Sequence, residues 1–322
     1  MSEAAGNGAS PSREYHLWVG ARTDTGRVRA NNQDAIGTWQ DLPQTVQFAE
    51  YGYLFAVADG VGGNEQGEVA SALAIETLFH SYYGDDTMDV PAALKRAVRL
   101  ANEAVYERGL SQSEDRAMGT TLVAGVIRGA TLTIGNVGDS RAYLARGRAQ
   151  MAPISKDHSL VAEAVRAGQM TPEQAKSSRQ RNVITRALGQ RQKVDVDIFE
   201  VDLMADDVVL LCSDGLHGIV DDAEMKQIVQ ALPPEEAATE LIDLANNRNA
   251  SDNVSAVVVK ATVTAEPSSV SAPAAPAMVL SETATDRLPA VPEKRGVPIA
   301  AIIAAVVAVL VVIAIIVLFL VR

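Results

Sequence analysis

Four aspartates stand at the ends of apolar, strand-like runs and are the side chains most able to do chemistry: Asp59, Asp139, Asp214 and Asp252. The first three follow YLFAVA, TIGNVG and VVLLCS, and the fourth precedes VSAVVV. A single carboxylate in such a place is commonly a turn former or a helix cap. Four that converge cannot all stay ionised unless cations lie between them. The pattern therefore predicts a metal site if the strands adjoin.

The donor types indicate which metal would bind. Carboxylate oxygens are hard ligands that suit magnesium or manganese. The four histidines of the chain show no zinc-ligand spacing. In VADGVGG, Asp59 is followed by Gly60, whose carbonyl no side chain shields, so both residues could ligate one ion. The same loop lacks the Lys-Ser/Thr ending of a P-loop and the spacing of a dinucleotide fingerprint.

A cationic side chain stands upstream of these carboxylates. Arg29 lies five residues before Asp34, in the stretch RANNQD. A guanidinium suits a planar, bidentate hold on phosphate, although a lone arginine is more often part of a surface ion pair. Arg29 is therefore a candidate phosphate ligand only in combination with the metal site.

Composition narrows the class of protein. The chain has 322 residues and 48% hydrophobic residues, enough for a sizeable core. Its 28 Lys and Arg against 40 Asp and Glu give a net charge of −12, which argues against nucleic acid as a partner. The single cysteine, Cys212, excludes an intrachain disulfide and, inside an apolar strand, is predicted to be plain core.

The elements that must position the candidate residues can be read from the hydrophobic pattern. Val-, Ile- and Leu-rich runs bounded by Gly, Asp or Asn predict strands at 17–21, 53–58, 121–127, 131–137, 208–212 and 254–260. Helical spacing and end signals predict helices at 68–82, 91–109, 160–167, 222–231 and 234–246. Strands adjoin in pairs and helices follow in pairs, so the expected class is α+β with antiparallel sheets.

The two ends of the chain differ from this body. Residues 1–14 predict a disordered tail, and the Ala- and Pro-rich stretch 265–298 predicts an extended linker. Residues 299–321 are 23 apolar residues with no charge, which as a helix would cross a bilayer. Lys294 and Arg295 precede this run and one arginine follows it, which favours a single-pass protein of the cell membrane whose globular part faces the cytoplasm.

Eight motifs in a fixed order carry a resemblance to a known family. They are RVRANNQD (27–34), VADGVGG (57–63), GTT (119–121), GNVGDSRAYL (135–144), SKDHS (155–159), ITRALG (184–189), LLCSDGL (210–216) and SDNVS (251–255). Together they resemble the bacterial form of the type-2C metal-dependent protein Ser/Thr phosphatases (PPM family). The resemblance covers about residues 19–259 and implies a four-layer αββα fold for 15–264, a β-sandwich of two antiparallel sheets flanked by pairs of helices.

The resemblance also implies a role for each matching position. The implied ligands of two metal ions, with a third and weaker one, are Asp59, Gly60, Asp139, Asp214 and Asp252. Arg29 would grip the substrate phosphate, Asp34 would orient metal-bound water and Asn253 would support the site less directly. The segment 160–182 matches the family's flap beside the active site. The neighbouring His158, between Asp157 and Ser159, is more typical of a structural hydrogen-bonder.

The implied activity is hydrolysis of phosphoserine and phosphothreonine in proteins by water activated at a two-metal site of Mg²⁺ or Mn²⁺. Phosphorylated proteins would be the partners, among them Ser/Thr kinases and their substrates, and the last helix would tether the enzyme to the membrane. The alternative is a catalytically weak relative that binds phosphoproteins or regulatory partners there. Gln33, where the family often has Glu, favours that alternative, whereas retention of all four aspartates favours the enzyme. A metal nuclease is disfavoured by the charge of −12.

Overall fold

The computed structural model describes residues 15–43, 45–62, 66–87, 89–112, 118–149 and 151–263. The predicted tail, the predicted linker and the predicted membrane helix lie outside these residues. In the part of the chain that is described, none of the helices has the length and apolar character needed to cross a membrane.

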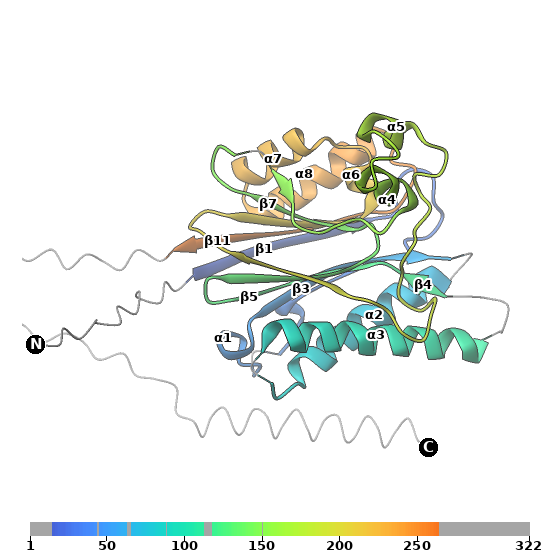
Figure 1. The fold of residues 1–322 in the computed structure, drawn as a ribbon. Coiled ribbons are helices and arrows are strands. Elements are labelled where there is room, and N and C mark those ends of the chain that lie inside the picture. The colour runs from blue at the N-terminus through green and yellow to red at the C-terminus, as the bar shows by residue number, and fades with distance from the viewer. Residues whose placement is uncertain are drawn as a thin grey trace, which may run out of the picture. The chain divides into compact units, whose positions relative to one another are not determined.

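Two antiparallel sheets form the centre of the domain (Figure 1). The first has the strand order β1-β11-β10-β7-β8, with bounds Tyr15–Asp24, Val254–Val263, Val208–Cys212, Arg141–Ala145 and Ala152–Pro153. The second has the order β2-β3-β5-β6-β9, with bounds Asp34–Thr38, Tyr53–Val61, Leu122–Arg128, Thr131–Val137 and Asp197–Asp202, and β4 (Gly119–Thr120) pairs with β3. This is the predicted α+β sandwich.

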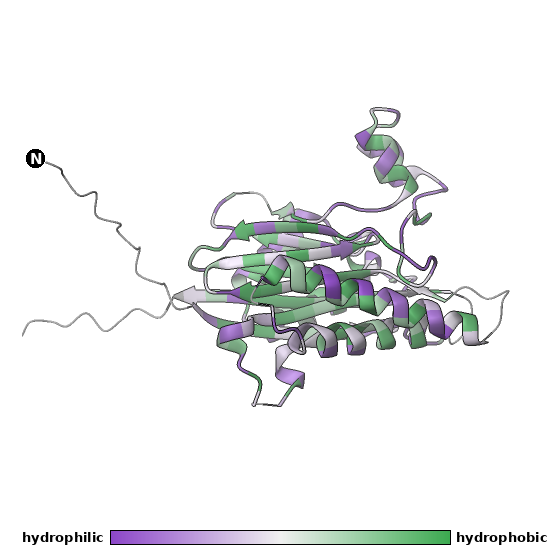
Figure 2. Cartoon of the chain, turned by 60° about the horizontal axis from the view of Figure 1, so that its bottom comes forward, coloured by the Kyte–Doolittle hydropathy of each residue, from purple (hydrophilic) through white to green (hydrophobic). Residues whose placement is uncertain are grey.

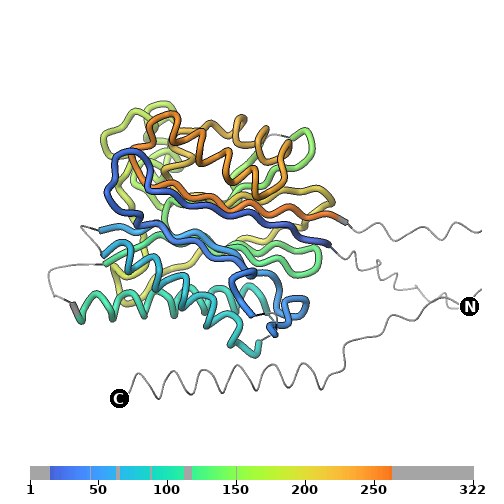
Figure 3. The backbone as a smooth tube through the Cα atoms, turned by 180° about the vertical axis from the view of Figure 1, so that it is seen from behind, coloured from blue at the N-terminus to red at the C-terminus, as the bar shows by residue number. Residues whose placement is uncertain are grey.

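Strands β1 and β11 make the longest ladder of the first sheet. They pair in register from Tyr15 opposite Val263 to Asp24 opposite Val254. Figure 3 shows the two strands side by side, blue and orange, although they come from opposite ends of the described chain. The ladder therefore closes the domain by joining its first strand to its last.

Helices cover the outer face of each sheet. On the second sheet lie α2 (Gln66–Tyr83) and α3 (Val90–Gln112), and on the first lie α7 (Asp222–Ala231) and α8 (Pro234–Asn247). Short helices complete the domain: η1 (Trp39–Asp41), α1 (Phe48–Tyr51), α4 (Leu160–Arg166), α5 (Pro172–Ser177) and α6 (Asp214–His217). Figure 2 shows that the foreground helices α2 and α3 alternate hydrophilic and hydrophobic residues, as helices with one buried face do.

Three hydrophobic clusters hold these layers together. One lies between the sheets and includes Phe55 and Leu211, and the other two lie under the helix pairs. The apolar stripe predicted for α3 is confirmed, since Leu94, Val98 and Val105 are fully buried. Cys212 is buried as well, as predicted for a core thiol.

The predicted strands and helices are all confirmed with ends shifted by a few residues, but several elements were not predicted. The longest of these are β2, β7, β9 and α5. Strand β2 has the sequence DAIGT. Its aspartate and glycine are residue types that are uncommon in strands, so its composition did not predict one. It forms because it pairs along its whole length with β3, a contact that local sequence does not reveal.

Candidate metal centre

Asp34 and Asp59 face each other across the β2–β3 ladder. The register pairs Asp34, the first residue of β2, directly with Asp59. Asp59 was expected to follow its strand, and this is wrong, because β3 continues to Val61 by pairing Gly60 and Val61 with the short strand β4. Directly opposite residues of antiparallel strands keep their Cβ atoms about 5 Å apart. The second sheet thus brings two carboxylates to one place.

Asp214 and Asp252 come to the same place from the first sheet. Asp214 opens α6 after β10, and Asp252 lies two residues before β11. Partial burial raises the pKa of Asp59 well above its ordinary value, and the charges of Asp34, Asp214, Asp139 and Asp252 raise it further. Burial and the charge of Asp252 likewise raise the pKa of Asp214. Five carboxylates from both sheets therefore share one electrostatic site.

Two serine hydroxyls bond one oxygen of the Asp34 carboxylate. Ser213 Oγ and Ser255 Oγ donate to Asp34 Oδ2 at 2.8 and 2.6 Å. Burial raises the pKa of Asp34 to about 7, against the opposing effect of these hydrogen bonds. Its other oxygen, Oδ1, is buried and has no hydrogen-bond partner among the described residues. Sequence reasoning missed Ser213, although its place beside Asp214 in LLCSDGL could have drawn attention to it.

Asp139 sits in a turn that two histidines fix. The Gly138 N–H donates to His158 Nδ1 at 3.0 Å, and His217 Nε2 is 3.0 Å from the Asp139 carbonyl oxygen. His158 is thus a structural hydrogen-bonder, as predicted, whereas His217 gave no signal in the sequence. Asp139 is 6% exposed, and burial raises its pKa to about 7. Its Oδ1 is a second buried oxygen that lacks a partner within the described chain.

Gly60 lies where only a glycine fits. A Cβ built there would stand 2.3 Å from the Gly67 carbonyl oxygen and 2.6 Å from that of Gln33. The first turn of α2 and the residue before β2 thus pack directly against the Gly60 backbone. These contacts require a glycine at this position, and the role of the Gly60 carbonyl as a metal ligand stays a prediction.

Arg29 lies at the solvent-exposed side of the aspartate cluster, next to Asp252. Its Nη2 lies 2.7 Å from Asp252 Oδ2, and the arginine side chain is 50% exposed. The hydrogen bond with Asp252 raises the pKa of Arg29. The guanidinium is therefore anchored by Asp252, while half of the side chain is open to solvent.

Asn253 ties the Arg29 loop to the strand that follows Asp252. Its Nδ2 donates to the carbonyl oxygens of Thr25 and Asn31 at 2.9 and 3.0 Å. Its Oδ1 accepts from the Gln33 N–H at 2.8 Å. Every polar atom of the amide is used in this bridge, so Asn253 positions its neighbours.

These residues fit a hard divalent cation. Within the described ranges no three His, Cys, Asp or Glu side chains form a ready-made metal group. The carboxylates repel one another, and Asp252 is held by its ion pair with Arg29. Both effects keep the carboxylate side chains apart. The donors are oxygens throughout, and the two unpartnered buried oxygens of Asp34 and Asp139 indicate unmet demand for positive charge. Magnesium or manganese would satisfy it.

We expect the metal-free protein to unfold more easily at pH 8 than at pH 5. Asp34 and Asp139 have pKa values of about 7 in the folded protein, against an ordinary value near 3.8. The folded state therefore binds more protons than the unfolded state in this window, and stability falls as pH rises from about 4 to about 7. Thermal unfolding in a chelator measures this.

Two comparisons sharpen that measurement. Asp139→Asn should make the pH dependence shallower, because one of the carboxyl groups with a raised pKa no longer titrates. Added Mn²⁺ should raise the melting temperature more at pH 8 than at pH 5, since protons compete with the cation for the same oxygens. A metal-free melting temperature that rises steadily from pH 5 to pH 8 would contradict the assignment.

Comparison with known proteins identifies the family. The sequence profile of protein phosphatase 2C matches residues 21–254. The chain belongs to this family. The serine/threonine phosphatase stp of Listeria innocua is 34% identical over 244 residues, covering 74% of this chain and 94% of the relative. The serine/threonine protein phosphatase PstP of Mycobacterium tuberculosis is 38% identical over 242 residues, covering 75% of this chain and 44% of the relative.

A solved structure extends the comparison to the fold and to metal. The catalytic domain of PstP in complex with two manganese ions superposes with a TM-score of 0.67 at 36% identity, covering 77% of this chain and 100% of that domain. This protein phosphatase 2C is thus a serine/threonine protein phosphatase with the α+β fold of its relatives. Dependence on Mn²⁺ or Mg²⁺ is implied by the family.

Proposed function

We propose that this phosphatase removes phosphate from phosphoserine and phosphothreonine at a two-metal site built by the carboxylate group described above. The residues that would hold the two ions are Asp59, Gly60 through its carbonyl, Asp214 and Asp252, with Asp139 and Asp214 at a third, weaker site. The supporting observation is that both sheets deliver aspartates to one end of the sandwich, where burial and the neighbouring carboxylates raise the pKa values of Asp59 and Asp214.

The ions, when bound, would supply charge that neutralises the phosphate and lowers the pKa of water. Arg29 would bind the phosphate itself. Its guanidinium is anchored by Asp252, while half of the side chain is open to solvent. A planar pair of guanidinium N–H donors matches two oxygens of a phosphate, so Arg29 would hold the substrate in one orientation.

Asp34 would orient the attacking water. Both serine hydroxyls bond Oδ2, which leaves Oδ1 as the oxygen able to accept a hydrogen bond. The raised pKa of Asp34, about 7, also lets this oxygen take up a proton near neutral pH. Asn253 would keep the Arg29 loop against the strand that follows Asp252.

Metal removal tests this function directly. A phosphothreonine peptide should be hydrolysed at least about 10²-fold faster with Mn²⁺ than in a chelator, because the cations offset charge repulsion in the transition state. Inorganic phosphate release is the readout. Binding of the peptide without turnover at any Mn²⁺ or Mg²⁺ concentration would instead support the catalytically weak, phosphoprotein-binding alternative.

We also propose that the enzyme is a single-pass protein of the cell membrane with its catalytic domain (15–264) in the cytoplasm. The support is the sequence alone: a linker over 265–298, an uncharged run over 299–321, and the basic pair Lys294 and Arg295 before it. Membrane-associated Ser/Thr kinases and their phosphorylated substrates would then be its partners.

Deletion of residues 297–322 should move the enzyme from the membrane fraction to the soluble fraction with its activity per mole unchanged. The removed segment includes the whole apolar run, and the catalytic residues all lie before it. Fractionation followed by a phosphate-release assay measures both properties. A full-length chain found in the soluble fraction, or a deletion that stays with the membrane, would contradict the tether.

A further inference from the structure

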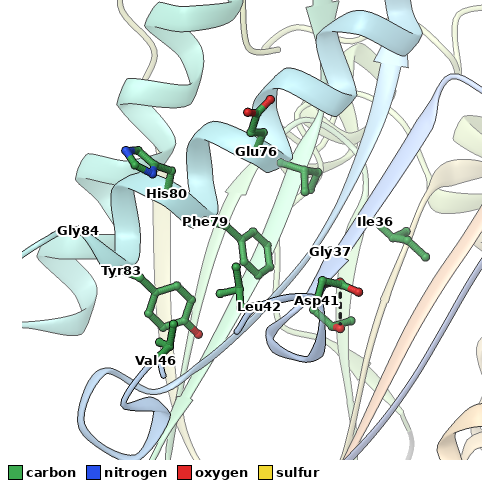
Figure 4. A pocket seen from close by; sticks show the side chains of 12 residues that line it. Ile36, Gly37, Asp41, Leu42, Val46, Glu76, Phe79, His80, Tyr83 and Gly84 are labelled. Carbon is green, nitrogen blue, oxygen red and sulfur yellow. Dashed lines mark hydrogen bonds between the residues drawn. The ribbon is translucent and has the colours of Figure 1, made fainter. Parts of the chain in front are cut away.

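A cavity lies between the edge strand β2 and helix α2. Its volume is about 620 Å³ (Figure 4). Ile36, Leu42 and Val46 line one side, and Ile75, Phe79 and Tyr83 of α2 line the other. The size and the apolar walls are typical of a binding pocket.

The wall formed by Tyr83 is rigid. Its ring contacts Phe48, Tyr51 and Tyr82 at centroid distances of 5.8, 6.4 and 5.2 Å. Its hydroxyl donates to the Gly52 carbonyl and accepts from the Leu54 N–H, both at 3.0 Å. A pocket whose wall is fixed in this way does not have to be ordered on binding, which lowers the entropic cost of occupying it.

The edge of β2 offers backbone groups to the same pocket. Strand β2 is the first in the order of its sheet, and among the described strands it pairs with β3 alone. The N–H groups of Asp34 and Thr38 turn away from β3, because they bond the side chains of Asn32 and Asp41. In an antiparallel pair, every second residue points its N–H and C=O away from the partner strand. Ile36 lies halfway between Asp34 and Thr38, so its N–H and C=O also point away from β3.

Two of the polar side chains that line the pocket are carboxylates. Asp41 and Glu76 line it, and neither a lysine nor an arginine is among its described lining residues. Figure 4 shows Leu42, Phe79 and Tyr83 grouped together, with Glu76 and His80 at the margin. An occupant with an apolar side chain next to a basic one would match this distribution.

We propose that this pocket docks an extended segment of the phosphoprotein substrate. The segment pairs with the Ile36 backbone, inserts an apolar side chain between Leu42, Phe79 and Tyr83, and sets a Lys or Arg beside Glu76. This mode adds a strand to a free sheet edge, with main-chain bonds for affinity and a pocket for specificity. Ile36 is two residues from Asp34, about 7 Å along the strand, so one peptide can reach both sites.

The binding part is tested with fluorescein-labelled peptides Lys-Val-X-Val-Lys, in which X is Leu, Met or Phe. We expect saturable binding by anisotropy and slower hydrogen exchange at the Ile36 amide. Glu76→Lys should weaken binding at least about tenfold. The matched control is Glu240→Lys, on the exposed side of α8, which should bind as the wild type does. Absence of saturable binding below about 1 mM for all three peptides would overturn the proposal.

The substrate part rests on the proposed function and is tested separately. A phosphothreonine peptide that carries the docking sequence should have a kcat/KM at least about tenfold above the same peptide without it, and Glu76→Lys should remove the difference. Equal kcat/KM values would overturn substrate docking while leaving the phosphatase intact. Loss of turnover on both peptides, with peptide binding retained, would refute the proposed catalytic site and not the pocket. Self-association that Glu76→Lys abolishes, without peptide binding, would assign the pocket to a second copy of the chain.

Discussion

Asp59→Asn should lower the metal-dependent kcat/KM at least about 10³-fold, equivalent to about 4 kcal/mol in activation free energy. Asp59 is the carboxylate on which the charges of the four others act, and it is one of the residues proposed to hold the ions. The asparagine has the same shape but lacks the charge that would hold them. Phosphate release with Mn²⁺, measured across substrate concentrations, gives the value.

Stability separates lost catalysis from a damaged fold in this variant. Without metal at pH 8, Asp59→Asn should be at least as stable as the wild type, because it removes one charge from a group of like charges. The stabilisation by Mn²⁺ should shrink at the same time. Asp243→Asn, in the exposed part of α8, is the matched control and should change neither property. Wild-type turnover by Asp59→Asn would refute the site.

Gly60→Ala should reduce both stability and metal-dependent activity. The new methyl would lie 2.3 Å from the Gly67 carbonyl oxygen and 2.4 Å from its carbonyl carbon, and backbone atoms of a helix cannot simply turn aside. Overpacking of this kind costs about 1–3 kcal/mol, or about 2–4 °C in melting temperature per kcal/mol for a domain of this size. The shift of α2 would also displace the carbonyl proposed to ligate a metal.

Gly62→Ala is the control for that experiment, two residues along the same loop. A Cβ there meets nothing closer than 3.6 Å, an ordinary van der Waals distance. It should therefore melt and turn over as the wild type does. If the two variants behaved alike, the close approach at Gly60 would not be what the site depends on.

The sequence predicted most strands and helices and drew attention to the aspartates, because both leave local marks, whereas the layered arrangement was implied by the family resemblance. Apolar runs ending in Asp and Gly marked the strand ends, and helical spacing marked α3. Pairing between distant segments leaves no such mark. Strand β2 becomes a strand only by lying against β3, and that pairing is what sets Asp34 opposite Asp59.

The supporting residues were harder to predict for the same reason. Ser213 and His217 act on side chains or carbonyls that lie far away in the chain, on Asp34 and Asp139. A serine in a strand-to-helix turn and a single histidine in a short helix are common in any protein. Only the three-dimensional structure shows that each meets an aspartate of the site.

The ladder between β1 and β11 has a practical consequence for engineering the domain. Tyr15 and Val263 are directly opposite each other, so about 5 Å separates the points where the chain enters and leaves. A short linker can join these points without crossing the domain. New termini could then be opened at Gly129 or Gly147, two tight turns where an added Cβ would meet nothing within 4 Å. Such circular permutants would place a reporter or a partner domain at the turn that contains Gly129 or at the turn that contains Gly147.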